Sequence, residues 1–307
     1  MITSFFNKSR PLYFAFVFFI ALLAFIISKT NGLNNELTLD FILKQIILFL
    51  IVLGSILLLS FIVNKNSLTN NSNYEILLFS LFLLFITQSI SNTNILLSNF
   101  FVLLGLRRII SLRSQKNIKK KLFDAAFWIA IATLFYFWSI LFFALIVLSL
   151  VLYTDHNIRH WIIPFLGFAT VFLLSTAVSV ILFNSYFGVF NWYSGVSYDF
   201  SNYNTIQYLI AITVLLSFGI WSSMFYLKNI KKKKKALRVS FKTIIIAVII
   251  GFLVVVQAPN KSGSEFLFLF APLAIIIANY IEIIQEKWFK EIFLAVLVLV
   301  PFILLML

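Results

Sequence analysis

Four carboxylates and one lysine stand in polar segments between long apolar runs. They are Glu36, Asp40, Asp199, Glu265 and Lys261. Side chains of these types can act as acids or bases and can bind polar substrates. A carboxylate can serve as a general base, and charged groups beside it can bind a polar substrate. The sequence therefore predicts Asp40 or Glu36 as a catalytic base. It predicts Asp199, Lys261 and Glu265 as substrate-binding residues.

The segment from Asn184 to Asn204 is rich in tyrosine and tryptophan. Aromatic faces stack on sugar rings, so we expect Trp192 and Tyr193 to form a platform for a sugar beside the carboxylates. The same residue types also form the aromatic belt that membrane proteins place at the level of the lipid headgroups. Both interpretations are open on the sequence alone.

Two basic clusters occupy residues 107–121 and 228–242, each next to an apolar run. Such a cluster could bind anionic headgroups or a polyprenyl phosphate at the membrane surface, with Arg107 and Arg108 as contact residues. It could also serve only as an orientation signal. Nucleic acid is not predicted as a partner, because the clusters abut apolar runs and belong to no recognisable nucleic-acid-binding fold.

Metal and thiol chemistry have little support in the sequence. Without cysteine, the chain has no disulfide, thiolate nucleophile or cysteine zinc site. His156 and His160 are its two histidines, four residues apart and with Asp155 adjacent to the first. This spacing could hold a metal, but a short interfacial turn with no assured third ligand is the simpler interpretation. No metal and no cofactor are predicted.

Apolar runs follow one another along the chain of 307 residues, which is 62% hydrophobic and 11% charged. A soluble domain has about 25% charged residues, and a bilayer crossing needs about 20 apolar residues. We therefore expect an all-α integral membrane protein of about eleven transmembrane helices, in a single polytopic domain over residues 1–307. The runs cover residues 12–27, 41–63, 74–90, 95–106, 122–136, 138–153, 161–183, 205–227, 243–258, 266–284 and 291–307.

The distribution of positive charge predicts the orientation. Residues 122–153 are too long for one span, so we expect a tight hairpin that turns near residues 137–139. With a cytoplasmic N-terminus and an external C-terminus, 21 of the 24 lysines and arginines then lie inside. The three outside are Lys29, Lys44 and Lys261. This split agrees with the positive-inside rule.

The predicted spans are nearly free of ionisable residues, and those in or directly beside a span lie within a turn or two of a helix end. They are Lys44, Glu75, Asp124, Glu265, Glu282 and Glu291. Ion-coupled transporters usually carry a charge near the midplane of the membrane. The pattern therefore disfavours a transporter.

The opening residues MITSFFNKSRPL and the segment NKSGSEFLFLFAPLAIIIANYIE at residues 260–282 resemble a family of Bacteroidetes membrane proteins of about this length. The likeness covers the whole chain and brings no established activity. Together with the predicted spans, it implies a multi-pass protein of the bacterial inner (cytoplasmic) membrane.

The basic segment 107–121 and the following LFDAAFWIAIATLFYFWSILFFALIVLSLVLY resemble the middle of polyprenyl-phosphate-dependent GT-C glycosyltransferases, over about a third of the chain. The resemblance implies a GT-C-like helix arrangement and a polyprenyl-phosphate-linked sugar as substrate. In that superfamily a carboxylate of the first external loop is the catalytic base, and Glu36 and Asp40 are the matching positions. The loop here, from Ser28 to Asp40, lacks the longer helical insertion of the family.

Two hypotheses follow. In the first, the chain is an envelope protein that handles a lipid-linked sugar, either transferring it or holding its carrier. In the second, it is a non-catalytic membrane scaffold or assembly partner. The gathered outer carboxylates favour the first hypothesis, and the short first external loop favours the second.

Overall fold

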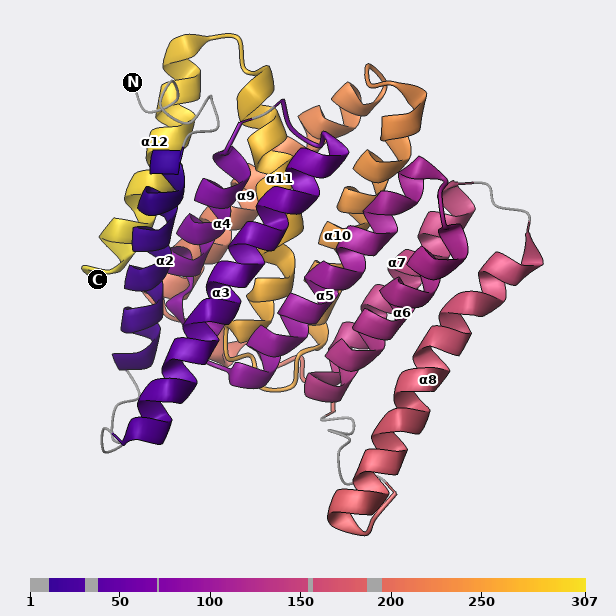
Figure 1. Cartoon of the computed structure of the whole chain (residues 1–307). Coiled ribbons are helices and arrows are strands. Elements are labelled where there is room, and N and C mark those ends of the chain that lie inside the picture. Colours follow the sequence, from indigo (N-terminus) through magenta and orange to yellow (C-terminus); the bar gives the residue numbers. More distant parts are fainter. Residues whose placement is uncertain (1–10, 31–37, 71, 154–156, 187–194) are drawn as a thin grey trace. The chain divides into compact units, whose positions relative to one another are not determined.

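The computed structural model of the chain describes residues 11–30, 38–70, 72–153, 157–186 and 195–307. These residues form α-helices and short 3₁₀ turns, without a strand (Figure 1). The helices are α2 (Pro11–Thr30), α3 (Leu39–Asn66), α4 (Tyr74–Phe85), α5 (Thr93–Ser111), α6 (Ile118–Phe135), α7 (Leu141–Leu152), α8 (Ile158–Phe183), α9 (Ile206–Ile230), α10 (Lys235–Gln257), α11 (Leu267–Ile283) and α12 (Lys287–Leu304). The turns are η1 (Thr87–Ile90), η2 (Leu112–Ser114), η3 (Phe137–Ile140), η4 (Ser201–Tyr203) and η5 (Ser264–Phe266).

Each of the apolar runs predicted from the sequence falls on one of these helices, so the all-α prediction is confirmed for the described residues. Within that part of the chain, seven helices are long and apolar enough to cross a membrane: α2, α3, α5, α8, α9, α10 and α11. This composition indicates a membrane-embedded protein. The helices α4 and α7 are apolar but have only 12 residues each.

The predicted turn near residues 137–139 falls on η3. The α-helix breaks at Tyr136, whose backbone is extended with φ −147° and ψ 112°. The turn η3 packs against both α6 and α7, and these helices also contact each other. They lie side by side in Figure 1, so the chain folds back at this point.

The chain divides into two compact units, each assembled from segments that are far apart in the sequence. The first unit contains Met1–Leu96, Asp199–Lys233 and Lys261–Leu307. The second contains Leu97–Tyr198 and Lys234–Asn260.

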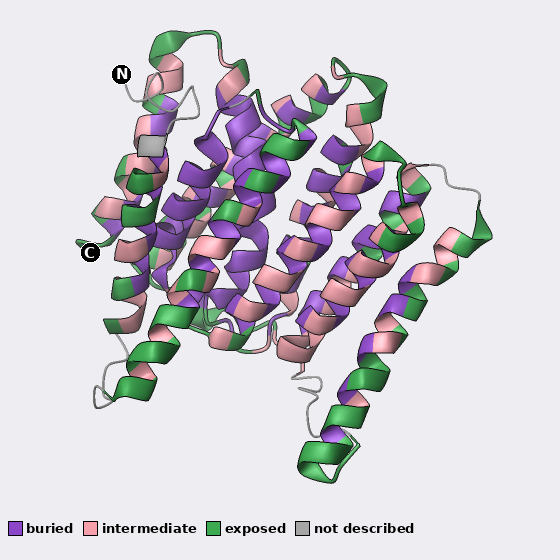
Figure 2. Cartoon of the chain, in the orientation of Figure 1, coloured by how far each residue is buried: buried purple, intermediate pink, exposed green. Residues whose placement is uncertain are grey.

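Two helices, α4 and α11, form the core of the first unit. All twelve residues of α4 are buried, as is α11 from Leu267 to Ile281 (Figure 2). The two helices contact each other, while α2, α3 and α12 contact α4 and α9 contacts α11. A helix that is apolar on every face is stable when other helices surround it, which explains why these two occupy the centre.

Close packing of α6 against α8 characterises the second unit. A Cβ atom on Gly167 of α8 would lie 2.8 Å from the backbone oxygen of Phe123 and 3.0 Å from the Ala126 Cβ. Away from this contact much of α8 is exposed (Figure 2). Its exposed large apolar residues include Leu173 (65% exposed) and Ile181 (77%). Such a face is costly in water and suited to lipid.

Candidate functional site

Within the first unit, the segment before α9 meets the segment before α11 around Lys261. The Lys261 side chain is 2% exposed, and its Nζ lies 4.6 Å from the centroid of the Phe200 ring. An ammonium over an aromatic face is attracted by the negative charge of the ring face. Burial lowers the pKa of the Lys261 ammonium from its ordinary value.

Glu265 organises the turn that follows. Its carboxylate is 1% exposed and accepts hydrogen bonds from the Tyr203 hydroxyl, the Gly263 backbone N–H (3.1 Å) and the Ser262 hydroxyl (3.2 Å). Three donors therefore occupy its oxygens, which makes this carboxylate a structural acceptor that joins η4 to η5.

Tyr208, in the first turn of α9, packs on the same segment. Its hydroxyl donates to the Ser262 backbone oxygen at 3.0 Å, and its ring centroid lies 5.4 Å from that of Tyr203. Gly263 has a φ of +88°, and a Cβ atom at this position would overlap the Tyr208 ring and hydroxyl. Only glycine combines this left-handed backbone with so close an approach.

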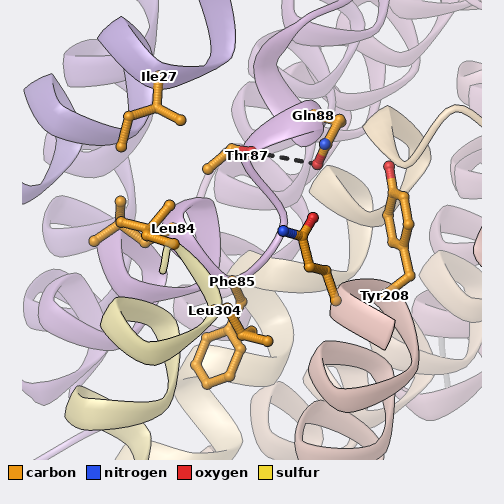
Figure 3. Close-up of a pocket in the computed structure, with 9 residues that line it drawn as sticks. Ile27, Leu84, Phe85, Thr87, Gln88, Tyr208 and Leu304 are labelled. Carbon is orange, nitrogen blue, oxygen red and sulfur yellow. Dashed lines mark hydrogen bonds between the residues drawn. The ribbon is translucent and has the colours of Figure 1, made fainter. Parts of the chain in front are cut away.

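The other side of Tyr208 faces a cavity of about 210 Å³ (Figure 3). One part of its lining is apolar and the other carries amides and hydroxyls, and none of the described residues that line it is charged. The apolar residues are Ile27, Leu84, Phe85, Leu304 and Leu305, and the polar ones are Thr87, Gln88, Gln207 and Tyr208. In Figure 3 the Thr87 hydroxyl points to Gln88 Oε1, to which it donates at 3.3 Å.

Such a lining suits an uncharged polar group attached to an apolar chain. The cavity is smaller than the roughly 300–1,000 Å³ of pockets for drug-sized ligands. It has room for a headgroup and a short part of a chain. Because η1 contacts η5, the cavity lies next to the Glu265 turn.

The structure places some of the predicted site residues in this region and others elsewhere. Asp199 is fully exposed beside η4. The Ser201 backbone N–H donates to Asp199 Oδ1 at 2.9 Å, and this bond, with another to the Ser201 side chain, lowers the pKa of the carboxyl. Asp40 is exposed in the first turn of α3. Within the described residues, no hydrogen bond or ion pair joins Asp40 to Lys261 or Glu265.

Three predicted residues lie outside the described part of the chain: Glu36, Trp192 and Tyr193. Arg107 and Arg108 belong to the second unit, near the end of α5. Arg108 Nη2 forms an ion pair with Asp124 Oδ2 at 3.0 Å, which links α5 to α6.

Sequence reasoning did not single out the polar residues of the cavity. Thr87, Gln88 and Gln207 stand at the ends of apolar runs, where single amides and hydroxyls look like ordinary boundary residues. Of the three, Thr87 is buried, Gln88 is half-buried and Gln207 is exposed, so the sequence carries no burial signal that sets them apart. Only the fold shows that these three residues come together.

Comparison with known protein families relates the chain to one of them. A family model described as a family of unknown function, DUF6427, matches residues 5–306. Neither the curated proteins nor the solved structures contain a match to the chain.

Proposed function

Because the chain belongs to DUF6427, a family of unknown function, we propose its role from the geometry of the site. The protein is a multi-pass protein of the bacterial inner membrane that holds a lipid-linked sugar, with the sugar in the cavity beside Tyr208. The carrier is a polyprenyl phosphate, whose first apolar units lie along the apolar part of the same cavity. Its phosphate, which joins these units to the sugar, faces the opening of the cavity, because none of the described lining residues is charged.

The observation that carries this proposal is the divided lining of the cavity. Gln88 and Gln207 offer amide donors and acceptors to sugar hydroxyls, and the hydroxyls of Thr87 and Tyr208 add to them. Ile27, Leu84 and Leu304 offer an apolar wall to the chain. A ligand with both characters in one molecule satisfies both parts of the lining.

Binding is better supported than transfer. A general base must come within about 2.6–3.2 Å of the proton that it removes. Glu265, whose turn η5 contacts η1, already accepts three hydrogen bonds, and Asp40 is not among the lining residues. The competing proposal is a membrane scaffold without a ligand. It predicts that no lipid-linked sugar binds in this cavity.

The proposed topology has eleven passes, with the cavity on the outer side. The lining residues come from the C-terminal ends of α2, α4 and α12 and from the N-terminal end of α9. For all four ends, the positive-inside count predicts the external side. An external cavity is where a lipid-linked sugar in the outer leaflet would be reached.

Cysteine labelling tests this topology, and the chain has no native cysteine to interfere. Single cysteines at Ser197 and Ser262 should react with an impermeant thiol reagent added to intact cells. Those at Asn117 and Asn229 should react only after the membrane is opened. Labelling of residue 229 but not of residue 197 in intact cells would contradict the predicted sidedness of everything after η3.

Direct binding tests the proposed ligand. A synthetic short-chain polyprenyl-phosphate-linked hexose should bind the purified protein in detergent, as measured by native mass spectrometry. Replacing Gln88 and Gln207 together with leucine should weaken binding about 10- to 100-fold, because sugar hydroxyls lose two amide partners.

Two controls accompany this measurement. Asp40→Asn should bind like the wild type, because Asp40 does not line the cavity. The wild type should bind the same carrier without its sugar more weakly than it binds the sugar-linked carrier. The double variant should bind the two carriers equally. Equal binding of the sugar-linked carrier by wild type and double variant, or no binding by either, would refute the proposal.

A further inference from the structure

The C-terminal end of α2 carries a lysine beside the cavity. Lys29 Nζ donates to the Ser91 backbone oxygen at 2.9 Å. The Ser91 backbone N–H in turn donates to the Gln88 backbone oxygen at 3.0 Å, and both Gln88 and Ile27 of α2 line the cavity (Figure 3). Lys29 is half-buried and Ser91 is exposed. The ammonium therefore lies next to the cavity where a ligand can reach it.

The Lys29 ammonium keeps donors for such a ligand. A lysine ammonium has three N–H donors. The Ser91 oxygen takes one of them, and no second hydrogen bond of this group occurs among the described residues. The other close group is the Phe25 ring, whose centroid lies 5.8 Å from Nζ. Two donors are therefore available to an anion.

A second lysine, Lys44 of α3, adds positive charge at the same place. The helices α2 and α3 contact each other, and Lys44 is the charged group that acts on Lys29. Asp40 stands one turn before Lys44, yet neither lysine forms an ion pair in the described part of the chain. Two ammonium groups repel each other, and an anion beside them offsets this repulsion.

Positive charge is rare on this side of the proposed topology. Of the 24 lysines and arginines, only Lys29, Lys44 and Lys261 are predicted to be external. Lys261 lies over the Phe200 ring. The other two run against the positive-inside rule, so orientation does not explain them, and they act on each other beside the cavity.

We propose that Lys29, supported by Lys44, binds the phosphate of the lipid carrier. This inference rests on the proposed function, in which the described cavity lining offers the phosphate no charged partner. The phosphate joins the apolar chain to the sugar, so it lies where the apolar and polar parts of the lining meet. Lys29 follows Ile27 of the apolar part by two residues and is linked through Ser91 to Gln88 of the polar part. A lysine ammonium binds phosphate as a compact point charge.

Native mass spectrometry with the carrier alone tests this site separately from the sugar. The probes are a short-chain polyprenyl phosphate and the uncharged polyprenol of the same length, each added to the purified full chain in detergent. The wild type should bind the phosphate about tenfold more tightly than the alcohol, and Lys29→Gln should remove this difference, because a charge-assisted contact is lost. Lys44→Gln should have a smaller effect, since Lys44 is exposed and its charge is screened. Both variants should bind the polyprenol like the wild type, which shows that they are folded.

Lys65→Gln is the matched control. Lys65 stands in the last turn of α3, and its Nζ lies 5.0 Å from the Phe61 ring centroid, much as Lys29 lies over Phe25. Lys65→Gln should bind the phosphate like the wild type. Equal binding of the phosphate by wild type and Lys29→Gln, or an equal loss in Lys65→Gln, would refute the site. Displacement of the polyprenyl phosphate by phosphatidic acid at equal concentration would overturn the assignment to the carrier.

The phosphate site and the sugar site fail in different ways. A preference for phosphate over alcohol that depends on Lys29 supports the phosphate site, even where an attached sugar adds nothing to binding. A gain from the sugar with no effect of Lys29→Gln supports the sugar site and refutes the phosphate site.

Discussion

Replacing Gly263 with alanine is expected to destabilise the protein by about 2–3 kcal/mol and to weaken binding in the cavity beside Tyr208. The left-handed backbone, with φ +88°, costs a non-glycine residue about 1–2 kcal/mol. The new methyl group also displaces Tyr208, whose hydrogen bond to the Ser262 oxygen contributes about 1 kcal/mol. Thermal unfolding in detergent measures the stability, and native mass spectrometry measures the binding.

Gly195→Ala is the matched control. Gly195 has a similar φ of +82°, but a Cβ atom there would meet no atom within 4 Å. Gly195→Ala should therefore lower stability only by the cost of the left-handed backbone, and it should leave binding unchanged. Equal losses in the two variants would show that contact with Tyr208 is unimportant, and the arrangement around Glu265 would need to be reconsidered.

Replacing Gly167 with alanine should lower stability by about 1–3 kcal/mol, the usual cost of overpacking a close contact. The new Cβ would lie 2.8 Å from the backbone oxygen of Phe123. A backbone oxygen cannot move aside by a rotamer change as a side-chain atom can. The contact is therefore relieved only if α8 shifts away from α6. Because small residues permit the close approach of membrane helices, leucine at this position should be worse than alanine.

Gly105→Ala provides the comparison within the same unit. There the closest atom to a new Cβ is Ile129 Cγ1 at 2.9 Å, a side-chain atom that can change its rotamer. We expect a smaller fall in the unfolding midpoint for Gly105→Ala than for Gly167→Ala. The reverse order would mean that α8 adjusts easily on α6.

Glu265 and Lys261 show what the fold adds to a prediction made from charge. Glu265 and Lys261 were predicted as binding residues because they are charged and stand in one polar segment. In the structure both residues are buried. Glu265 accepts hydrogen bonds from three donors, and the Lys261 ammonium lies over the Phe200 ring. Charge type alone does not tell whether a side chain serves a ligand or satisfies its own backbone. The base roles of Asp40 and Glu36 stay predictions.

Local properties of the sequence determined the helices. Long apolar runs form helices in a membrane because each backbone N–H and C=O must find its hydrogen-bond partner within the same segment. This requirement can be applied to each run without knowing which other segments pack against it. The break at η3 was predictable for the same reason, since residues 122–153 exceed one crossing and fall short of two with an ordinary loop. The helices α6 and α7 and the turn between them follow from length alone.

Only the tertiary structure decided which helices are central and which polar residues meet. The apolar runs of α4 and α8 look alike in composition, yet α4 is buried on every side and α8 exposes most of one face. The cavity joins Ile27, Gln88, Gln207 and Leu304 from four helix ends that are up to 277 positions apart in the chain. Packing between distant segments depends on close contacts at small residues, such as Gly167 against the Phe123 backbone and Gly263 against the Tyr208 side chain. Hydropathy and charge, read along the chain, contain no measure of that approach.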